Sequence, residues 1–497
     1  MKRLNLRLVV CCVACFIVAI ASSRASGADP TEDDYYRIVE IPIPPDITLE
    51  VGAVEWMPDG RLAVSTRRGD IYFVENALSE TLDDVTFKKF ASGLHQIFGL
   101  SQLDGVLYAT QRPEVTRLLD TDGDGEADLF ETVSDAWETA GGNYEWAWGS
   151  KFDKDGNIWV ILTLDEAGGT SRQTSDFRGW CLRINADGTV LPTASGIRSP
   201  GGIGFNAVGD AFYADNQGEW TATNALKWIR PGAFTGNPSG NVFYSLTDVI
   251  GPRPKDPKNR SRIMTEANRI PEFEPPAVWF PYYKMGQSAC GVICDAKGQF
   301  GPFKGQMFVT DQAHSLLMRV YLEKVDGHYQ GACFPFRAGL SSGPVSAIFA
   351  QDAQVNSLIV GGTNRGWGST GRGAFSLERV DWTGKIPFEV HEMRAKSDGF
   401  ELTFTQDIDP KTAINVDSYA LETYTYVYSS GYGSPEVDRT TPAITNLAVG
   451  EDGRSVRLYI DGLQEGHVHE LHMNGIRSAD GLPLLHPVGY YTLNYIP

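Results

Sequence analysis

Several patterns that carry familiar chemistry are missing from this sequence. It has no Gly-rich phosphate loop, no nucleophile elbow and no His-Glu-x-x-His pattern, and the lack of Cys-x-x-Cys-His excludes covalently attached haem. Positive charge is also scarce, because 43 Lys and Arg residues stand against 62 Asp and Glu residues and leave a net charge of −19. Such a surface repels phosphate backbones, so we expect no nucleic-acid partner.

Long apolar runs are equally rare. One lies near the N-terminus, where Leu8 to Ala21 follows a basic start and precedes small residues up to Ala28. The run is short for a bilayer crossing and typical of a secretory leader. We therefore predict a signal peptide at residues 1–28, a periplasmic or extracellular location, and no membrane span. A lipoprotein attached through Cys15 is the alternative interpretation.

Cysteine is sparse once the leader is removed. Four of the seven cysteines remain, at Cys181, Cys290, Cys294 and Cys333. An exported protein can form disulfides, and four cysteines allow three pairings. Buried thiols that pack as small hydrophobic side chains are the other interpretation, and the sequence leaves both open.

One pattern recurs six times between about residue 50 and residue 380. Each copy is an apolar strand with small residues, a tight polar turn, a second apolar strand and an abrupt polar cluster. Asp-Gly and Gly-Asp at most of the turns supply the positive φ angles of hairpins. Repeats of roughly fifty residues with this content are typical of propeller blades. The copies are Val51–Arg68, Gln96–Arg112, Glu145–Leu164, Gly201–Gln217, Cys290–Gln312 and Val345–Arg365.

The repeat predicts an all-β fold. We expect a six-bladed β-propeller at residues 29–385, followed by a small Ig-like β-sandwich at residues 386–497. A strand at Tyr35 to Pro42 should complete the last blade, which would remove two free sheet edges. Residues 231–288 are rich in Pro, Gly, Asn and charge, and we interpret them mostly as a long surface insertion. A seventh blade in that segment is the alternative.

The polar clusters identify a candidate site. They follow the second strand of each blade, so they should open on one face of the propeller, here called the top face, together with the connections between blades. Arginines, carboxamides, carboxylates and histidines on one opening suit a hydroxyl-rich ligand such as a carbohydrate. The competing interpretation is that they only satisfy loop backbone. The candidates are Arg67, His95, Gln111, Arg112, Glu145, Arg198, Asp215, Asn216, Gln217, Asp311, Gln312, His314, Arg365 and Trp367.

An acidic loop is the strongest local motif. Acidic side chains stand at loop positions one, three, five, nine and twelve with Gly at six, which is the EF-hand spacing of oxygen ligands around Ca²⁺. We predict a structural calcium on the bottom or rim of blade two; a solvated acidic turn is the alternative. The predicted ligands are Asp120, Asp122, Asp124, the carbonyl of Glu126, Asp128 and Glu131.

Three histidines near the C-terminus could suggest a second metal site. His467 and His469 would share a face of a strand, with His472 nearby. We favour surface histidines on the sandwich over metal ligands.

Several phrases of the sequence are similar to a known superfamily. The chain resembles secreted bacterial propellers of the glucose/sorbosone dehydrogenase-like superfamily, which includes soluble quinoprotein glucose dehydrogenase. The phrases are LEVGAVEWMPDGRLAVSTRRGDIY, TRLLDTDGDGEADLFE, YADNQGEW, GPFKGQMFVTDQAHS, GACFPFR and RGWGS.

The resemblance implies pyrroloquinoline quinone (PQQ) on the top face and oxidation of a sugar hydroxyl. It implies His95 as the general base, which suits a histidine titrating near working pH. It further implies Arg112 or Arg365 as the cation beside the quinone. Glu145, Asp215 and Asn216 would then hold substrate or ion. The sequence departs from the family at Tyr144, where another His is expected, and it lacks a haem domain.

Three functions are therefore weighed. The leading hypothesis is a PQQ-dependent sugar or aldose dehydrogenase, which needs a separate electron acceptor. A cofactor-free carbohydrate lyase or hydrolase is the second. A non-catalytic propeller that binds glycan or protein is the third.

Overall fold

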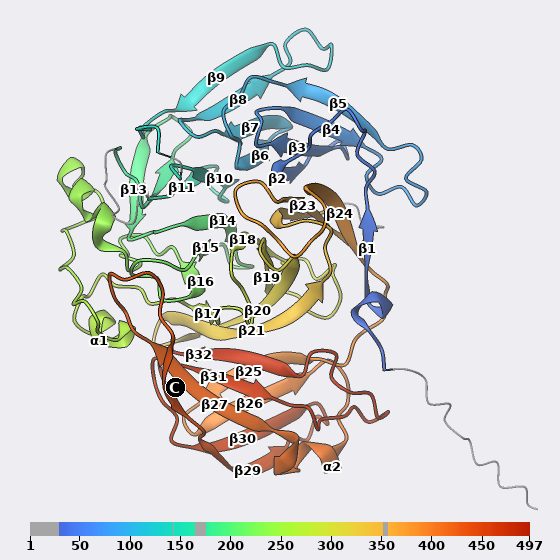
Figure 1. The fold of residues 1–497 in the computed structure, drawn as a ribbon, viewed down its shortest axis with the longest axis vertical. Helices are drawn as coiled ribbons and strands as arrows, with labels where there is room; N and C mark the ends of the chain where they lie inside the picture. The colour runs from blue at the N-terminus through green and yellow to red at the C-terminus, as the bar shows by residue number, and fades with distance from the viewer. Residues whose placement is uncertain (1–28, 143, 165–174, 351–355) are drawn as a thin grey trace, which may run out of the picture.

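The computed structural model describes residues 29–497 apart from 143, 165–174 and 351–355. The predicted signal peptide lies outside the described residues. The described chain is nearly all β, and most of its strands form four-stranded antiparallel sheets arranged around a centre (Figure 1). The innermost strands β2, β6, β10, β14, β18 and β22 contact one another in that order, and β22 returns to β2. This closed ring confirms the predicted six-bladed propeller.

The blades follow the chain from inner to outer strand. The first three are β2 (Val51–Trp56), β3 (Leu62–Thr66), β4 (Ile71–Glu75) and β5 (Thr86–Ala91); β6 (Gly99–Leu103), β7 (Val106–Thr110), β8 (Val115–Leu119) and β9 (Leu129–Ser134); and β10 (Ala147–Phe152), β11 (Ile158–Leu162), β12 (Trp180–Ile184) and β13 (Val190–Ser195). The last three are β14 (Pro200–Phe205), β15 (Ala211–Asp215), β16 (Asn224–Trp228) and β17 (Val278–Phe280); β18 (Ala289–Cys294), β19 (Met307–Asp311), β20 (Leu316–Val325) and β21 (His328–Ala338); and β22 (Pro344–Phe349), β23 (Ser357–Thr363), β24 (Phe375–Trp382) and β1 (Tyr36–Glu40).

The N-terminal strand closes the ring as expected. β1 pairs with β24 in antiparallel register from Tyr36 opposite Trp382 to Glu40 opposite Glu378. Blade six is thus built from both ends of the propeller segment. This pairing covers the sheet edge that a free sixth blade would expose.

The long insertion differs from the expectation. Its last strand, β17, is the outer strand of blade four, and its short helices η2 (Pro238–Leu246) and α1 (Ile263–Ala267) precede it. Phe234, Ile270 and Phe273 are fully or almost fully buried in one cluster with Tyr428 from the C-terminal part of the chain. No seventh sheet of the ring forms within the described ranges. The insertion therefore combines segments that pack in the core beside the C-terminal unit with a largely exposed stretch at residues 251–262.

The C-terminal unit consists of two sheets around its own core. One sheet has the order β25-β26-β30-β29, and the other contains β28, β27, β31 and β32. The assignment of this unit to the Ig-like class stays a prediction. Its elements are β25 (Val390–Lys396), β26 (Gly399–Phe404), α2 (Pro410–Ala413), η3 (Val416–Ser418), β27 (Ala420–Tyr426), β28 (Glu436–Thr440), β29 (Ala443–Val449), β30 (Ser455–Asp461), β31 (His467–His472) and β32 (Val488–Leu493).

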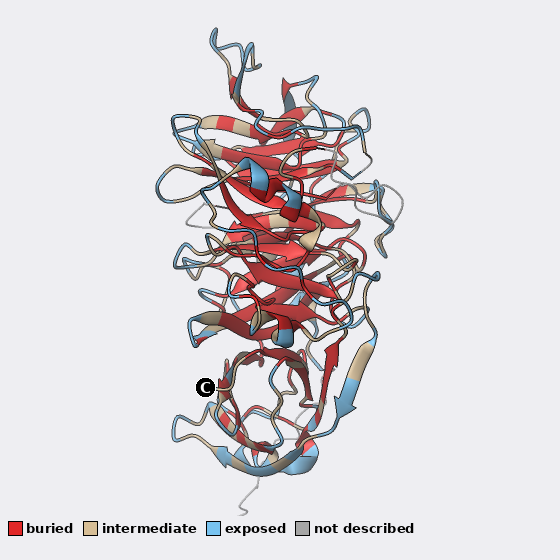
Figure 2. Ribbon diagram, turned by 90° about the vertical axis from the view of Figure 1, so that its left-hand side faces the viewer, coloured by how far each residue is buried: buried red, intermediate tan, exposed pale blue. Residues whose placement is uncertain are grey.

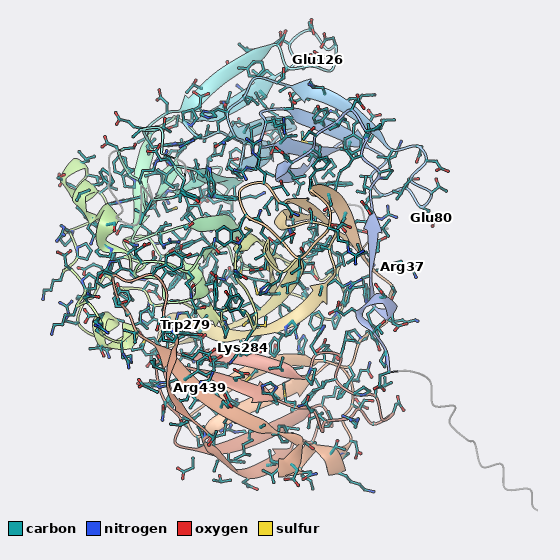
Figure 3. The ribbon with its side chains drawn as sticks, viewed as in Figure 1. Arg37, Glu80, Glu126, Trp279, Lys284 and Arg439 are labelled. Atoms are coloured by element: carbon teal, nitrogen blue, oxygen red, sulfur yellow. The ribbon has the colours of Figure 1, made fainter. Side chains whose placement is uncertain are left out.

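This unit is fused to the propeller through main-chain hydrogen bonding. β32 pairs with β21, the outer strand of blade five, with Ala332 opposite Tyr491. Blade five thereby continues as one eight-stranded sheet, and the two sheets of the C-terminal unit lie directly below the propeller in Figure 2. Lys284 adds ion pairs to Glu470 at 2.6 Å and Glu436 at 3.1 Å at the same junction, where Figure 3 labels it. The unit is a continuation of blade five and not a detached spacer.

The four remaining cysteines are free thiols. Cys181, Cys290 and Cys333 are buried and Cys294 is half-buried. Burial raises the pKa of each thiol, so the thiols are protonated at neutral pH and pack as small apolar groups. The interpretation as buried thiols is the one that the structure supports. In the described part of the chain no helix has the length and apolar content of a membrane span.

Glycine allows the innermost strands to approach closely. A Cβ placed on Gly52 would lie 1.9 Å from the carbonyl oxygen of Ile97, and one on Gly99 would lie 1.9 Å from that of Gly149. A Cβ on Gly201 would lie 2.2 Å from the carbonyl oxygen of Ala289. Each contact joins one blade to the next. The small residues of the repeat therefore allow the ring to close at its narrowest radius.

Gly99→Ala should destabilise the propeller. The added methyl group meets backbone and cannot be relieved by a rotamer change, so we expect a loss of about 2 kcal/mol or more in the free energy of unfolding. Urea denaturation followed by far-UV circular dichroism measures this loss. Gly368→Ala is the matched control, because nothing lies within 4 Å of its added Cβ. Equal stability of the two variants would contradict the close-approach explanation.

A buried charged cluster joins the N-terminal segment, blade five and the C-terminal unit. His486 contacts Glu389 through Nδ1 at 2.5 Å and Glu32, in η1 (Glu32–Asp34), through Nε2 at 2.9 Å. Arg337 in β21 forms a 2.8 Å ion pair with Glu32. Burial alone would lower the pKa of His486, but the charges and hydrogen bonds of Glu389 and Glu32 outweigh it and raise the pKa to about 9.

This cluster should make stability fall at alkaline pH. Because the folded-state pKa of His486 lies above the value of 6.5 expected when unfolded, its contribution is complete below pH 6.5 and is lost as pH rises through about 9. The loss is on the order of 3 kcal/mol. Urea denaturation at pH 6 and pH 9.5 measures it. His486→Gln should show a much smaller difference between the two pH values, whereas His472→Gln, which changes a histidine with 40% side-chain exposure, should keep the full difference.

Candidate functional site

A pocket of about 280 Å³ opens at the centre of the top face. Its walls are the polar clusters that follow the second strands of blades one, four, five and six, together with the connections that enter blades two to five. One wall comes from the C-terminal unit. The lining residues are Arg67, Phe98, Tyr144, Trp146, Trp148, Arg198, Ser199, Pro200, Gly201, Asn216, Gln217, Gln287, Ser288, Cys290, Gln312, Val345, Thr363, Arg365, Gly366, Trp367 and Tyr432.

Aromatic rings form one side of this pocket. The ring centroid of Phe98 lies 4.4 Å from that of Trp148 and 5.5 Å from that of Trp146. The indole N–H groups of Trp146 and Trp148 are buried and have no hydrogen-bond partner within the described part of the chain. Buried indole N–H groups normally find an acceptor, so these two donors are unsatisfied polar groups in the wall of the pocket.

Arg67 supplies a buried positive charge. Its side chain follows β3, its residue is only 8% exposed, and its guanidinium lies over the rings of Phe98 and Trp146 at 5.0 and 5.4 Å. The guanidinium donates to the carbonyl of Arg365, and its Nε has no partner in the described ranges. Burial, and then the charge of Arg365, lower its pKa to about 10.

The other two arginines of the pocket are held by carboxylates on their outer side. Arg365 forms an ion pair with Glu50 at 2.7 Å, and Arg198 forms one with Glu219 at 3.2 Å. Glu50 also pairs with Arg68, so its charge is shared by two exposed guanidinium groups. Among the described residues that line the pocket there is no Asp, Glu or His. The pocket is therefore positively charged.

Four carboxamides complete the polar lining. Gln312 donates to the carbonyl of Thr363 at 2.7 Å, Gln217 donates to that of Ala222 at 3.0 Å, and Asn216 donates to that of Ser199 at 3.1 Å. The Asn216 Oδ1 is buried without a partner in the described chain. These amides are fixed by loop backbone, and the Asn216 Oδ1 keeps the capacity to accept a hydrogen bond.

Half of the predicted site residues meet in this pocket. The structure brings together residues from blades one, four, five and six that lie up to 300 positions apart. They are Arg67, Arg198, Asn216, Gln217, Gln312, Arg365 and Trp367.

The predicted catalytic residues Glu145 and Arg112 lie outside the lining of the pocket. Glu145 is fully buried, and its carboxylate accepts hydrogen bonds from the backbone N–H groups of Ala140 to Gly142 and from Ser175. Burial raises its pKa, but these donors outweigh burial and hold the pKa below the usual value. Arg112 contacts the same carboxylate at 3.3 Å and donates to the carbonyl of Gly142. Both residues shape the loop that presents Tyr144 and do not line the pocket.

His95 does not line the pocket either. Its backbone N–H donates to the side chain of Gln111 at 2.6 Å, and its carbonyl accepts from Arg112 at 3.0 Å. Gln111 is buried and also donates to Thr116. Burial, and then the charge of Arg112, lower the pKa of His95. The assignment of His95 as the base is therefore not supported by its position.

Three further predicted site residues contact loop backbone or buried charges and do not line the pocket. Asp215 is fully buried and pairs with Lys227 at 2.8 Å. Asp311 is fully buried and accepts from the backbone N–H groups of Gln287, Ser288 and His314. His314 is held beside Asp311, with the two side chains 4.0 Å apart. These residues satisfy loop backbone or internal charge and are outside the pocket lining.

The sequence-based prediction missed the aromatic lining and Tyr432. Phe98, Trp146 and Trp148 stand at strand entries, where their pattern indicates core packing. Tyr432 lies in the C-terminal unit, about 65 residues after the last predicted site residue. The Tyr-rich and Gly-rich composition of residues 424–433 is the one signal that could have identified it.

The acidic loop between β8 and β9 brings three of its six predicted ligands together. Carboxylate oxygens of Asp120, Asp122 and Asp124 lie within 4.8 Å of one another, the sole such group found among the described residues. Asp128 accepts from Thr121, at 2.8 Å from its N–H and 2.6 Å from its hydroxyl, and Glu131 pairs with Arg117 at 3.0 Å.

The loop lies far from the pocket. Figure 3 labels Glu126 at the outer edge of blade two, away from the centre of the ring. An ion at this position could stabilise the outer hairpin of the blade and would not contact a ligand in the pocket. Calcium binding at the loop stays a prediction.

The C-terminal histidines do not gather into a metal site. His469 is fully buried with both ring nitrogens unpartnered in the described chain, and burial lowers its pKa to about 3. His472 contacts Glu470 at 2.9 Å. The interpretation as surface histidines is wrong for His469, which packs against Phe400 as a neutral ring.

A family comparison places most of the pocket within a recognised domain. A family model described as a domain of unknown function, DUF7133, matches residues 79–333, just over half of the chain. The chain belongs to this family. The DUF7133 segment contains Arg198 and the aromatic lining, whereas Arg67, Arg365 and Tyr432 lie outside it. No protein of curated function matches the sequence.

Solved structures of low sequence identity were also found. A PQQ-bound aldose sugar dehydrogenase from Streptomyces coelicolor is 16% identical, with 71% of this chain and 99% of that chain covered and a TM-score of 0.48. The PQQ domain of pyranose dehydrogenase from Coprinopsis cinerea is 11% identical, with 70% of this chain and 95% of that chain covered and a TM-score of 0.47. A gluconolactonase from Xanthomonas campestris is 14% identical, with 70% of this chain and 90% of that chain covered and a TM-score of 0.41.

Calcium should raise the melting temperature of the protein if the acidic loop binds it. Binding to the folded state alone stabilises by about 2.7 kcal/mol when free calcium is 100-fold above its Kd. Differential scanning calorimetry with Ca²⁺, and with excess chelator, measures the difference. Asp124→Asn removes one of the three clustered carboxylates and should abolish the increase. Asp155→Asn, in an acidic turn of blade three, should retain it, and equal melting temperatures of the wild type with and without Ca²⁺ would exclude the site.

Proposed function

We propose that the protein binds a carboxylate-bearing ring compound in the top-face pocket. The observation that carries this proposal is the buried guanidinium of Arg67. Buried charges are normally paired. The carboxylate whose charge acts on the pKa of Arg67 is Glu50, and it already forms ion pairs with Arg68 and Arg365. A carboxylate in the pocket would complete the pairing through a bidentate contact.

The aromatic lining supports a ring-shaped ligand. Trp146 and Trp148 offer faces for stacking and buried N–H donors beside the positive charge. Asn216 adds a free acceptor for a hydroxyl group. A carbohydrate with an acidic group, or a planar aromatic acid, matches this combination of donors, acceptor and rings.

PQQ is the first compound to test. It is a planar polycarboxylate, and the donor set of the pocket fits it: Arg67, Arg198 and Arg365 would hold its carboxylates, and Trp148 would lie against its ring. What the quinone would supply is a two-electron acceptor for the oxidation of a sugar hydroxyl. The chain itself would orient the ring and neutralise its charge. Export, predicted from residues 1–28, belongs to this proposal, as does a separate electron acceptor.

A non-catalytic role is the second candidate, and one observation favours it. Oxidation of a hydroxyl needs a group that takes the hydroxyl proton. None of the lining residues in the described chain is His, Asp or Glu. Binding of an acidic sugar without chemistry requires no such base.

Isothermal titration of the purified protein with PQQ, galacturonic acid and glucose tests the proposal. We expect the carboxylate-bearing compounds to bind and glucose to bind far more weakly. Arg67→Met should weaken binding about tenfold or more, because a charge-assisted contact is lost. It should leave the melting temperature of the ligand-free protein nearly unchanged, because it also removes an unpaired buried charge.

The control and the possible outcomes separate the candidates. Arg61→Met changes an arginine at the turn before β3, far from the pocket, and should bind like the wild type. PQQ binding with dye reduction on adding a sugar supports the dehydrogenase. Binding of galacturonic acid alone supports the second candidate. If neither acid binds, or if Arg67→Met binds as tightly as the wild type, the proposed function is wrong.

A further inference from the structure

The C-terminal unit contributes a loop to the top-face pocket. This loop, residues 427–435, joins β27 to β28 and reaches from the C-terminal sheet to the propeller face. Tyr432 at its tip lines the pocket, and its ring lies 5.3 Å from the guanidinium carbon of Arg198. In Figure 1 a red segment rises from the C-terminal sheet alongside blade four.

Main-chain hydrogen bonds dock this loop on the propeller. Trp220 donates to the carbonyl of Ser429 at 2.8 Å, Gly433 donates to that of Gly218 at 3.0 Å, and Ser434 donates to that of Ala222 at 2.9 Å. The propeller partners belong to the polar cluster of blade four, which also provides Asn216 and Gln217 to the pocket. The loop is thus attached to the wall that it extends.

Close packing at Gly433 fixes the position of Tyr432. Gly433 has a φ of +64°, and a Cβ there would lie 2.6 Å from the amide carbon of Gln217. A glycine satisfies both conditions at once. The backbone next to Tyr432 therefore lies against a pocket residue.

Two tyrosines of the loop have different roles. Tyr428 is 2% exposed, and its hydroxyl donates to the carbonyl of Gly236, so it anchors the loop in the insertion. Tyr432 is 60% exposed although it lines the pocket. Most of the surface of Tyr432 is therefore accessible at the pocket, whereas that of Tyr428 is not.

We propose that Tyr432 determines specificity by stacking on the ring of the ligand that the arginines hold. The inference rests on the proposed function, which supplies the ligand. It makes the C-terminal unit part of the binding site, so the propeller alone has an incomplete pocket. Tyr432 covers one face of the ligand next to Arg198, which holds its acidic group, and this arrangement favours cyclic acids over open-chain ones.

Ligand titration of the full chain tests this role. Tyr432→Ala should raise the Kd for the ring acids, PQQ or galacturonic acid, about three- to tenfold, and Tyr432→Phe should restore it, because stacking needs the ring and not the hydroxyl. The Kd for citrate, an open-chain polycarboxylate, should change less. Tyr283→Ala changes a tyrosine with 70% exposure that does not line the pocket, and it should bind like the wild type.

The outcomes separate this inference from the proposed function. If the wild type binds a ring acid and Tyr432→Ala binds it equally well, the role of Tyr432 is wrong and the proposed function stands. If no ring acid binds the wild type, both are wrong. Hydrogen exchange tests the docking of the loop without any ligand. We expect slow exchange at Gly433 and Ser434, and exchange as fast as in an unfolded peptide would overturn the inference by itself.

Discussion

The close approach of the innermost strands is the constraint on which the rest of the structure depends. Gly52, Gly99 and Gly201 bring three of the six inner strands against the backbone of the next blade at distances that no side chain tolerates. A ring closed at this radius places the ends of the second strands around one narrow opening. The three arginines of the pocket come from blades one and six and from the connection into blade four, so they converge because the ring is tight.

The sequence could predict the face of the site but not the direction of its side chains. The repeat identified all six blades, because alternating apolar strands and Asp-Gly turns are local signals. It also placed Arg67 and Arg365 on the correct face. It could not separate them from Glu145 and Asp311, because a polar residue at a strand end can turn to the opening or to the loop backbone. That choice depends on tertiary packing, which no local pattern records.

The contribution of the C-terminal unit to the pocket could not be predicted from the sequence for a different reason. β32 pairs with β21 across more than 150 positions, and Tyr432 reaches the pocket because that pairing aligns the two sheets. A local reading of residues 386–497 finds strands and no connection to the propeller. The burial of Phe234 and Phe273 within the insertion could not be predicted for the same reason, since they share a core cluster with Tyr428 from the C-terminal unit. Contacts between distant segments decide both cases.

The electrostatics of the pocket balance two requirements. Three arginines without partners would destabilise the ligand-free fold by mutual repulsion and desolvation, whereas three fully paired arginines would leave no charge for a ligand. Glu50 and Glu219 hold two of them from outside the pocket, and Arg67 forms no ion pair with a carboxylate in the described part of the chain. Around this pocket the chain has a net charge of −19, which repels anions at long range. Binding of the proposed acidic ligand would therefore depend on short-range contacts inside the pocket, with the buried guanidinium and the aromatic rings.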